Sequence, residues 1–265
     1  MSLLDHIDVL VLTWNEEANI GRTLDALVRF PRVVVLDSGS TDGTLGVVAQ
    51  YANARVCTRA FDHHAAQWNH GLAACGLEGE WVLALDADFL VPAALVEEIA
   101  QLDPPPSVNG YRARFSYCVQ GQPLRGSLYP ALTVLFRREG ATCLQDGHAN
   151  RLAVRSEVRD LDGRVFHDDR KSLAVWLAAQ DRYARLECDL LLRTPWRDLS
   201  WRDRLRSLVV VTPWLVPLYC LTVGRGLLDG WHGWYYALQR GIAESLLALR
   251  LLEARMTGGK AAPPC

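Results

Sequence analysis

The sequence lacks the features by which several protein classes are recognised from composition. Its 28 Lys and Arg residues are balanced by 30 Asp and Glu residues, for a formal net charge of −2. Nucleic-acid-binding proteins normally carry a basic excess, so no nucleic acid is expected as a partner. Half of the residues are hydrophobic, which is too large a share for a disordered chain. The 265 residues therefore predict one large folded domain, or one domain with a substantial appendage.

The sequence also lacks a cysteine pattern and a secretion signal. Its seven cysteines are scattered and include no Cys-x-x-Cys pair. An odd, dispersed set favours reduced thiols in a reducing compartment over a disulfide framework or a zinc site. The N-terminus carries Asp5 where a signal peptide would carry Lys or Arg, and the apolar run Val9 to Leu12 is too short for an export signal. We therefore expect the catalytic part to stay in the cytoplasm.

The first hundred residues alternate short strand-like runs with helical patterns. The expected strands cover 7–13, 32–36, 54–57 and 81–85, and the expected helices cover 15–30, 44–51, 65–74 and 93–102. Asn15, followed by two glutamates, is a suitable start for the first helix. The alternation predicts an α/β fold with an open, mainly parallel sheet and helices on both faces. Such sheets bind ligands at the carboxyl ends of their strands.

A different pattern follows Pro104-Pro105-Pro106. The sequence then predicts antiparallel strands, at 111–119, 132–137, 151–154 and 164–166. After Lys171 the pattern becomes helical. No internal repeat is visible. We expect a catalytic domain over 1–170, a helical region over 171–257 and a tail over 258–265.

A polar loop, Asp37-Ser38-Gly39-Ser40-Thr41-Asp42-Gly43-Thr44, follows the second expected strand. It is neither a Walker loop nor a Gly-x-Gly-x-x-Gly loop. A carboxylate at this strand end can accept a hydrogen bond from the N3–H of uracil or from a ribose hydroxyl. The alternative is an ordinary turn in which Asp and Ser cap the next helix.

Leu85-Asp86-Ala87-Asp88 gives a sharper signal. Two carboxylates at alternate positions after a hydrophobic strand repel each other unless a cation lies between or beside them. A hard divalent cation with oxygen ligands is the natural partner. It can bridge a diphosphate and offset the charge that develops on it as a leaving group. The alternative is a pair of solvated loop acids.

Two histidine-containing turns complete the set of candidates. His167 follows a short strand and can complete a metal shell, although a lone histidine is more often structural. The turn Gln145-Asp146-Gly147-His148 offers Asp146 as a general base, although such turns are often only turns.

These motifs together resemble the inverting family 2 glycosyltransferases of GT-A fold. The segments that carry this resemblance are Thr13 to Glu17, Val35 to Asp42 and Leu85 to Asp88. The chain is also similar to a narrower group, the lipopolysaccharide core glycosyltransferases that add a β-glucose to inner-core heptose. That similarity lies at 66–69, 167–173, 180–183, 227–231 and 234–240.

The resemblance implies a nucleotide-diphospho-sugar transferase with defined residue roles. Asp88, Asp86 and His167 would bind Mg²⁺ or Mn²⁺. Asp146 would be the catalytic base, with His148 as its rival because the family's usual Glu-Asp pair is Gln145-Asp146 here. The residues implied for binding of the UDP-sugar are Thr13, Asn15, Glu16, Asp37, Ser38, Gly39, Gln67, Asp86 and Ala87.

The implied reaction moves a hexose, glucose from UDP-glucose, to a hydroxyl of a lipid-linked glycan, with inversion at C1. Lipopolysaccharide inner core is the expected acceptor, and capsule or exopolysaccharide intermediates are alternatives. A catalytically inactive scaffold at the membrane is a further alternative, which the altered Gln145 keeps open. A haloacid-dehalogenase-like phosphatase is discounted, because its Asp-x-Asp would lie on the first strand and be followed by Thr.

The C-terminal third carries the features of a membrane surface. An uncharged run at 207–224 is barely long enough to span a bilayer and contains Pro213 and Pro217. Arginines precede it, and tryptophans cluster around it, as at a lipid headgroup boundary. We expect an amphipathic, re-entrant or interfacial attachment, peripheral or monotopic, on the cytoplasmic face of a bacterial inner membrane. The alternative is an ordinary helical subdomain. The tryptophans are Trp196, Trp201, Trp214, Trp231 and Trp234.

Overall fold

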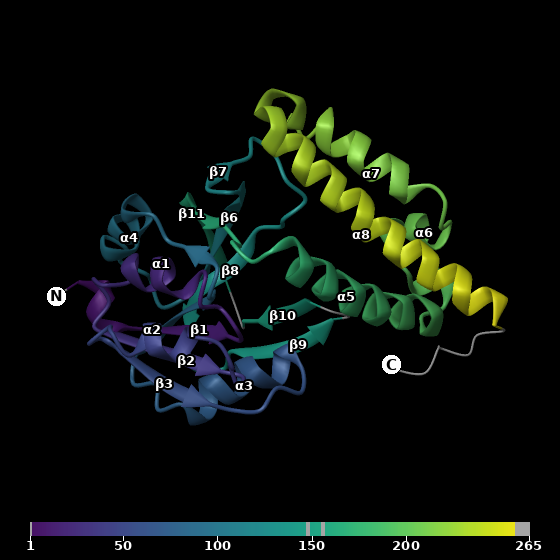
Figure 1. Ribbon diagram of the computed structural model, residues 1–265. Helices are drawn as coiled ribbons and strands as arrows, with labels where there is room; N and C mark the ends of the chain where they lie inside the picture. The colour runs from purple at the N-terminus through teal and green to yellow at the C-terminus, as the bar shows by residue number, and fades with distance from the viewer. Residues whose placement is uncertain (1, 147–148, 155–156, 258–265) are drawn as a thin grey trace. The chain divides into compact units, whose positions relative to one another are not determined.

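The computed structural model describes residues 2–146, 149–154 and 157–257. It divides into two compact units, one formed by residues 1–123 and 129–171 and the other by residues 124–128 and 172–265. The first unit holds a nine-stranded sheet, and the second unit is helical (Figure 1). The α/β class expected from the sequence is confirmed.

One half of the sheet is parallel, as expected. Its strands are mostly buried runs of Val and Leu, which suit a sheet covered on both faces. The pairing places Thr13 beside Asp37 and Leu12 beside Asp86, so the strands end together at one edge of the sheet. In order, the strands are β3 (Ala54–Thr58), β2 (Arg32–Asp37), β1 (Ile7–Thr13) and β4 (Trp81–Asp86).

The other half of the sheet differs from the expectation. β8 is antiparallel to β4 and β6, but β11 runs parallel to β6, and β11 is far longer than the three residues expected at 164–166. Short β5 pairs antiparallel with the end of β11, and β7 with the end of β6. The strands are β8 (Leu132–Arg137), β6 (Val108–Val119), β11 (Glu157–His167), β5 (Phe89–Leu90) and β7 (Gln122–Pro123).

Side chains that alternate along β1 pack against helices on opposite faces of the sheet. Val9 and Val11 belong to a core shared with α1 and α4, whereas Leu10 and Leu12 pack with α3. Helices therefore cover both faces (Figure 1). The elements are η1 (Leu3–His6), α1 (Ile20–Asp25), α2 (Thr44–Val48), α3 (His64–Ala74) and α4 (Ala93–Ala100).

The first helix begins later than expected. α1 starts at Ile20, and Asn15 has a φ of 53° in the left-handed region. The Asn15 N–H donates to Ser40 Oγ at 2.9 Å, and Asn15 Oδ1 accepts from the Thr41 N–H at 2.8 Å. Asn15 therefore joins the loop after β1 to the loop after β2 instead of capping a helix, a contact between segments 25 residues apart that a local pattern does not contain.

The expectation that all cysteines are reduced is wrong for one pair. Cys57 on β3 and Cys75 after α3 form a disulfide with Cα atoms 5.8 Å apart. The β3–α3 connection brings these residues together across 18 positions, at the Cα separation that a disulfide requires. Cys118, Cys143, Cys188 and Cys220 are free and buried.

The second unit has its own small core. Ala184, Cys188 and Leu191 of α5 pack with Leu247 and Leu251 of α8, and α7 also contacts α8. Among the described residues, none of the helices combines the length and the apolar character that a membrane crossing requires. The elements are α5 (Leu173–Arg193), η2 (Trp196–Asp198), α6 (Trp201–Ser207), α7 (Thr212–Leu221), η3 (Gly226–Asp229) and α8 (Gly230–Met256).

Candidate functional site

Asp37, at the end of β2, shapes the loop that follows it. Its carboxylate accepts from the Gly39 N–H at 2.9 Å and from the Ser40 N–H at 3.0 Å, and Ser40 Oγ donates to it as well. Gly39 has a φ of +89° and meets nothing at the position of a β carbon. The N-cap of α2 is Gly43, so Asp37 organises the loop and does not cap the helix.

Thr13 and Gln67 lie beside this loop. Thr13 is aligned with Asp37 across the β1–β2 pair, and its hydroxyl is buried without a hydrogen-bond partner. Gln67 on α3 is wholly buried and donates from Nε2 to Ser38 Oγ at 2.7 Å and to the Arg59 carbonyl at 3.0 Å. Buried polar groups are nearly always paired. The Thr13 hydroxyl is therefore available to form a hydrogen bond with a bound ligand.

The Asp86-Ala87-Asp88 segment is fixed by the backbone of its central residue. The Ala87 N–H donates to the Leu12 carbonyl at 3.1 Å, and Thr23 Oγ1 donates to the Ala87 carbonyl at 2.6 Å. Burial, followed by the charge of Asp88, raises the pKa of Asp86 to about 7. Ala87 thus holds Asp86 and Asp88 in place. Repulsion between their carboxylates disfavours the state in which both are charged.

Asp88 and His167 meet where β5 pairs with β11. The pairing sets His167 opposite Phe89, and His167 Nε2 lies 3.0 Å from Asp88 Oδ2. Rings of Phe89, Tyr117 and Tyr129 pack around the imidazole with centroids 4.8 to 5.3 Å away. The buried Nδ1 atom of His167 has no hydrogen-bond partner. The ring is therefore held firmly and has an unsatisfied nitrogen.

The two groups shift each other's protonation. Burial by itself would raise the pKa of Asp88, but the charge of His167 and its hydrogen bond bring it below the ordinary value. Burial by itself would lower the pKa of His167, but the charge of Asp88 raises it above the ordinary value. The pair is most stable when both members are charged.

The donor atoms fit a divalent cation. A carboxylate oxygen and an imidazole nitrogen at one place are usual ligands for such ions, and Asp86 lies two residues from Asp88. Within the described part of the chain, three ligand atoms lie within 4.8 Å of one another at another place, in Cys57, His70 and Cys75. The structure thus brings Asp88 and His167 together, and the ligand atoms of Asp86, Asp88 and His167 do not all lie within 4.8 Å of one another.

A buried asparagine, Asn19, joins the loop after β1 to the loop after β11. Its Nδ2 donates to Glu16 Oε2 at 2.7 Å and to Asp169 Oδ1 at 2.9 Å. Its Oδ1 accepts from Arg22 Nη2 at 2.7 Å and from the Arg170 N–H at 2.9 Å. Asn19 was not among the residues predicted from the sequence, because a single asparagine before a helix resembles a cap.

Asp168 is a buried carboxylate held by two arginines. Arg22 Nη1 lies 2.6 Å from Asp168 Oδ2, Arg170 lies 2.9 Å away, and the Gly121 N–H donates at 3.1 Å. Burial would raise the pKa of Asp168, but the hydrogen bond from Arg170 brings it below the ordinary value. This ion pair anchors the segment after His167 to α1, a role that the sequence analysis did not assign.

Lys171 forms an ion pair with Glu16. Burial and then the charge of Asp88 raise the pKa of Glu16 to about 7, although Lys171 acts in the opposite direction. Burial would lower the pKa of Lys171, but the charge of Glu16 raises it, with smaller contributions from Asp169 and Asp88. Lys171 is therefore a cation held among the acids of this site, and it too was not among the predicted residues.

The predicted base lies on a separate hairpin. β9 (Thr142–Asp146) pairs with β10 (Ala149–Ala153), and the backbone of Asp146 faces Ala149. Asn69 of α3 anchors this hairpin, because its side chain accepts from the Cys143 N–H at 2.8 Å and donates to the Cys143 carbonyl at 2.9 Å. The side chain of Asp146 and all of His148 lie outside the described residues, so both assignments remain predictions.

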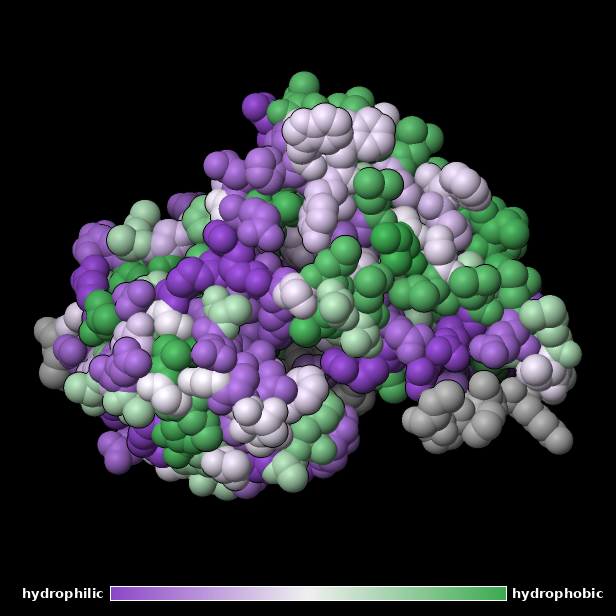
Figure 2. Space-filling view, viewed as in Figure 1, coloured by the Kyte–Doolittle hydropathy of each residue, from purple (hydrophilic) through white to green (hydrophobic). Residues whose placement is uncertain are grey.

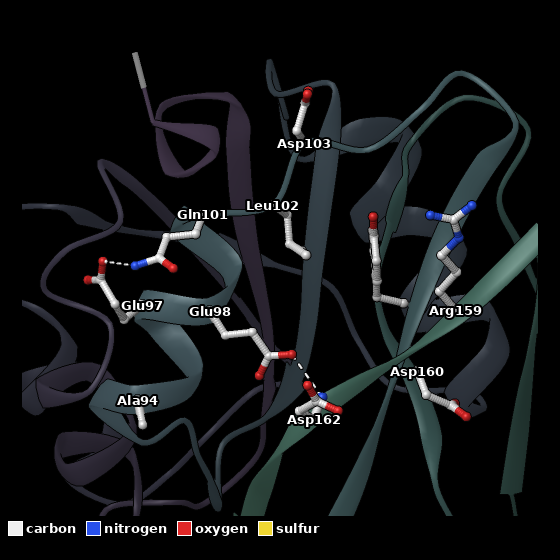
Figure 3. Close-up of a pocket in the computed structure, with 10 residues that line it drawn as sticks. Ala94, Glu97, Glu98, Gln101, Leu102, Asp103, Arg159, Asp160 and Asp162 are labelled. Atoms are coloured by element: carbon white, nitrogen blue, oxygen red, sulfur yellow. Dashed lines mark hydrogen bonds between the residues drawn. The ribbon is translucent and has the colours of Figure 1, made fainter.

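A pocket in the first unit contains none of the predicted residues (Figure 3). It lies between α4 and β11, and two of its acids already have partners in the fold. Glu98 accepts the N–H groups of Asp162 and Gly163, and Asp160 pairs with Arg112 at 2.6 Å. The pocket therefore has no part in the site built above.

Comparison with known proteins gives matches to glycosyltransferases. The family model described as glycosyl transferase family 2 matches residues 8–120. The chain is 32% identical over 100 residues to the lipopolysaccharide core biosynthesis glycosyltransferase LpsC of Rhizobium meliloti (strain 1021), which covers 36% of each protein. It is 30% identical over 98 residues to an uncharacterized glycosyltransferase of Rickettsia bellii (strain RML369-C), over 37% of this chain and 32% of that protein. The matches thus span about a third of the length of these curated relatives.

Solved structures give weaker matches. Glucosyl-3-phosphoglycerate synthase from Mycobacterium tuberculosis, in complex with Mn²⁺, uridine diphosphate and glucosyl-3-phosphoglycerate, has a TM-score of 0.46 and 20% identity over 70% of this chain and 78% of that one. S. aureus TarS 1-349, in complex with UDP-GlcNAc, has a TM-score of 0.43 and 18% identity over 95% and 92%. These TM-scores are too low to support an argument about function.

Proposed function

We propose that this protein is an inverting, metal-dependent glycosyltransferase that uses a UDP-sugar, a proposal supported by the match of residues 8–120 to the glycosyl transferase family 2 model. The observation that carries the proposal is the Asp88–His167 contact, in which a carboxylate and an imidazole meet 3.0 Å apart at the strand ends. The second ring nitrogen of the histidine is buried without a partner. Such a pair, close to Asp86, suits a divalent cation better than it suits a closed core.

Asp88 and His167, with Asp86 beside them, would hold Mg²⁺ or Mn²⁺. When bound, the ion would supply positive charge to the diphosphate leaving group. Lys171 adds a fixed cation among the same acids. The chain's own residues thus provide both the ligands for the ion and a further charge that stabilises the departing diphosphate.

The uridine would lie over the ends of β1 and β2. The Thr13 hydroxyl has a free hydrogen-bonding capacity there, and Asp37, Ser38 and Gln67 form a preorganised polar wall. Asn15, Glu16 and Gly39 shape the rim of the same place. A rigid arrangement of this kind orients the donor so that C1 of the sugar faces the acceptor.

Asp146 would take the proton from the acceptor hydroxyl, with His148 as the other candidate. The hydroxyl oxygen attacks C1 from the face opposite the diphosphate, a new C–O bond forms as the old one breaks, and the configuration at C1 inverts. Asn69 positions the hairpin that carries Asp146. A lipid-linked glycan of the lipopolysaccharide core type is proposed as the acceptor from the likeness to LpsC. Glucose is proposed as the donor sugar from the sequence resemblance to the core β-glucosyltransferases.

The helical unit would attach the protein to the cytoplasmic face of a bacterial inner membrane as a peripheral or monotopic protein. It exposes Trp214 (81%) and Trp231 (86%), together with Leu218 and Leu228. Hydrophobic side chains gather over α7 and α8 in Figure 2. Exposed Arg193 and Arg197 precede them. Apolar and aromatic side chains next to arginines suit the boundary between lipid tails and headgroups.

Calorimetric titration with a panel of UDP-sugars, with and without Mn²⁺, tests the donor site. We expect Mn²⁺-dependent binding of one UDP-sugar, and loss of that binding in Asp88→Asn. Asp160→Asn is the matched control, because it removes an exposed carboxylate of β11 that pairs with Arg112. No binding, or binding that ignores both the metal and Asp88, contradicts the proposal.

Transfer assays with the identified donor test the base. Asp146→Asn should keep donor affinity and lose transfer, and NMR of the wild-type product should show a β linkage from an α-linked donor. If His148→Ala loses transfer and Asp146→Asn does not, His148 is the base. Metal-dependent donor binding without transfer to any acceptor would indicate a scaffold.

A further inference from the structure

A second group of metal-ligating side chains lies at the end of β3 and on α3. The ligand atoms of Cys57, His70 and Cys75 lie within 4.8 Å of one another. Cys57 belongs to β3, His70 to the last turns of α3, and Cys75 is the C-cap of that helix. None of the three belongs to the donor site described above, and the inference below does not rest on the proposed function.

The fold holds these three residues in place. β3 pairs with β2 and sets Cys57 beside Leu36 of the buried core. α3 lies tightly on the sheet at Gly71, where a β carbon would come within 2.6 Å of Leu10. His70, next to Gly71, is therefore fixed relative to β3 by core packing, and we expect the three side chains to stay together when the disulfide is reduced. Ligands held by rigid elements need little reorganisation to bind a metal.

The ligand set has the chemistry of a zinc site. Two thiolates and one imidazole are a known three-residue zinc set that leaves a fourth position for water. The disulfide engages both sulfur atoms, so the set exists only in the dithiol form. Arg55 donates to the carbonyl groups of Cys75 and Gly76, and a nearby guanidinium favours the thiolate that a metal requires.

We propose that the reduced chain binds one Zn²⁺ through Cys57, His70 and Cys75, and that the disulfide form does not bind it there. Reduction of the disulfide takes up two electrons and two protons and gives two thiols, and a thiol or phosphine reductant supplies the electrons. Zinc binding then releases the two thiol protons and forms two Zn–S bonds and one Zn–N bond. The pair is thus a disulfide in one redox state and a metal site in the other.

Cobalt(II) and zinc(II) titrations of the full chain test the proposal. The protein is reduced with a phosphine, which takes the oxygen of one water as it leaves two thiols, and is compared with the untreated disulfide form. The reduced protein should show one thiolate-to-cobalt charge-transfer band that zinc abolishes at one equivalent. The donor-site residues contain no thiol, so cobalt bound there does not produce this band.

Variants separate the three ligands from the other thiols and histidines. Cys57→Ser should lose the band, and His70→Ala should weaken zinc binding by more than roughly tenfold, since even an outer-shell partner of a ligand is worth that much. Cys118→Ser and His64→Ala are the matched controls, one a buried free thiol and the other a histidine of the same helix. Both should bind as the wild type does.

A measurement on the unmutated chain covers the case in which a variant does not fold. Zinc should raise the melting temperature of the reduced protein by more than that of the disulfide form, in which only the proposed donor site can bind it, because a ligand stabilises the form that binds it. Absence of the band in reduced wild type, an unaltered zinc affinity in His70→Ala, or equal zinc stabilisation of both redox forms would overturn the proposal.

Discussion

Several tryptophans of the two units differ sharply in burial, although Trp14 of the first unit is also 48% exposed. Trp68 and Trp81 of the first unit are 6% and 1% exposed, whereas Trp214 and Trp231 of the second are 81% and 86% exposed. Tryptophan is among the largest apolar side chains, and burying one contributes strongly to a folded core. A unit that leaves several tryptophans on its surface does not gain this stabilisation from them. Large exposed apolar patches of this kind mark surfaces that bind a protein, a membrane or a ligand.

One ion pair from each unit shows the same difference, whereas Arg112–Asp160 of the first unit is exposed and Glu244 of the second is buried beside Arg206. In the first unit the carboxylate of Asp168 is buried and held by Arg22 and Arg170, next to the proposed metal site. In the second unit, pairs such as Asp181–Arg250 lie near the surface, with about 30% of each side chain exposed. In the first unit, the charged residues next to the proposed metal site are thus buried. The second unit exposes large apolar side chains on its surface. Four predictions can break or sharpen this comparison.

The largest effect is expected from Trp81→Ala. Trp81 is fully buried and packs under Arg137, whose guanidinium lies 4.6 Å from the ring centroid. Its removal should lower the free energy of unfolding by about 3–5 kcal/mol, whereas Trp231→Ala should change it by less than about 0.5 kcal/mol. Urea unfolding of both variants measures this difference, and equal losses would refute the contrast between the units.

Asp88→Asn should come next. Affinity for the metal-bound UDP-sugar should fall at least about 100-fold, which corresponds to roughly 2.7 kcal/mol, because a metal ligand is lost. Binding to lipid vesicles should stay as in the wild type. Calorimetry and vesicle sedimentation measure the two properties, and a loss of both would mean that donor and lipid binding are not separate.

The double variant Trp214→Ala, Trp231→Ala sharpens the comparison from the other side. Affinity for vesicles of phosphatidylethanolamine and phosphatidylglycerol should fall by roughly tenfold, or about 1.4 kcal/mol. Donor binding and the unfolding midpoint should be unchanged, because both rings are exposed. Unchanged vesicle binding would remove the support for a membrane surface on this unit.

Asp181→Asn should have the smallest effect. Asp181 lies 2.7 Å from Arg250 and 2.6 Å from Arg185. A half-exposed pair of this kind stabilises by about 0.5 kcal/mol. The hydrogen bond from Arg250 holds the pKa of Asp181 below its ordinary value. The contribution is therefore present above the ordinary Asp pKa and is lost as the pH falls through the folded-state pKa.

Urea unfolding of wild type and Asp181→Asn, at neutral pH and near pH 3, measures this contribution. The difference between the two proteins should be larger at neutral pH. A difference that grows on acidification would contradict the assignment.

Strands of the parallel half were predictable from the sequence. Ile7–Thr13 is a continuous run of buried apolar side chains ended by polar ones, and β1 has these bounds. Asp37, Asp86 and His167 were proposed as site residues from their position after predicted strands, and each is the last residue of a strand. Local patterns work here because burial on both faces leaves a clear signature in the chain.

Other features depended on contacts between distant residues. Asn15 resembles a helix cap, but its partners are Ser40 and Thr41. The Arg22–Asp168 pair joins residues 146 positions apart. The sequence around either residue does not indicate that the other is its partner. The parallel direction of β11 relative to β6 is likewise set by how the chain returns to the sheet.

The sequence by itself determined the alternation of strands and helices, the strand ends that carry the acids, and the exposed tryptophans of the helical unit, because each follows from periodicity or from residue type. Only the tertiary structure decided that Cys57 joins Cys75 beside His70, that Asn19 and Arg22 hold the segment after His167, and that Lys171 lies among the acids. These pairings are set by packing across the sheet, and a linear pattern does not record which distant side chains packing brings into contact.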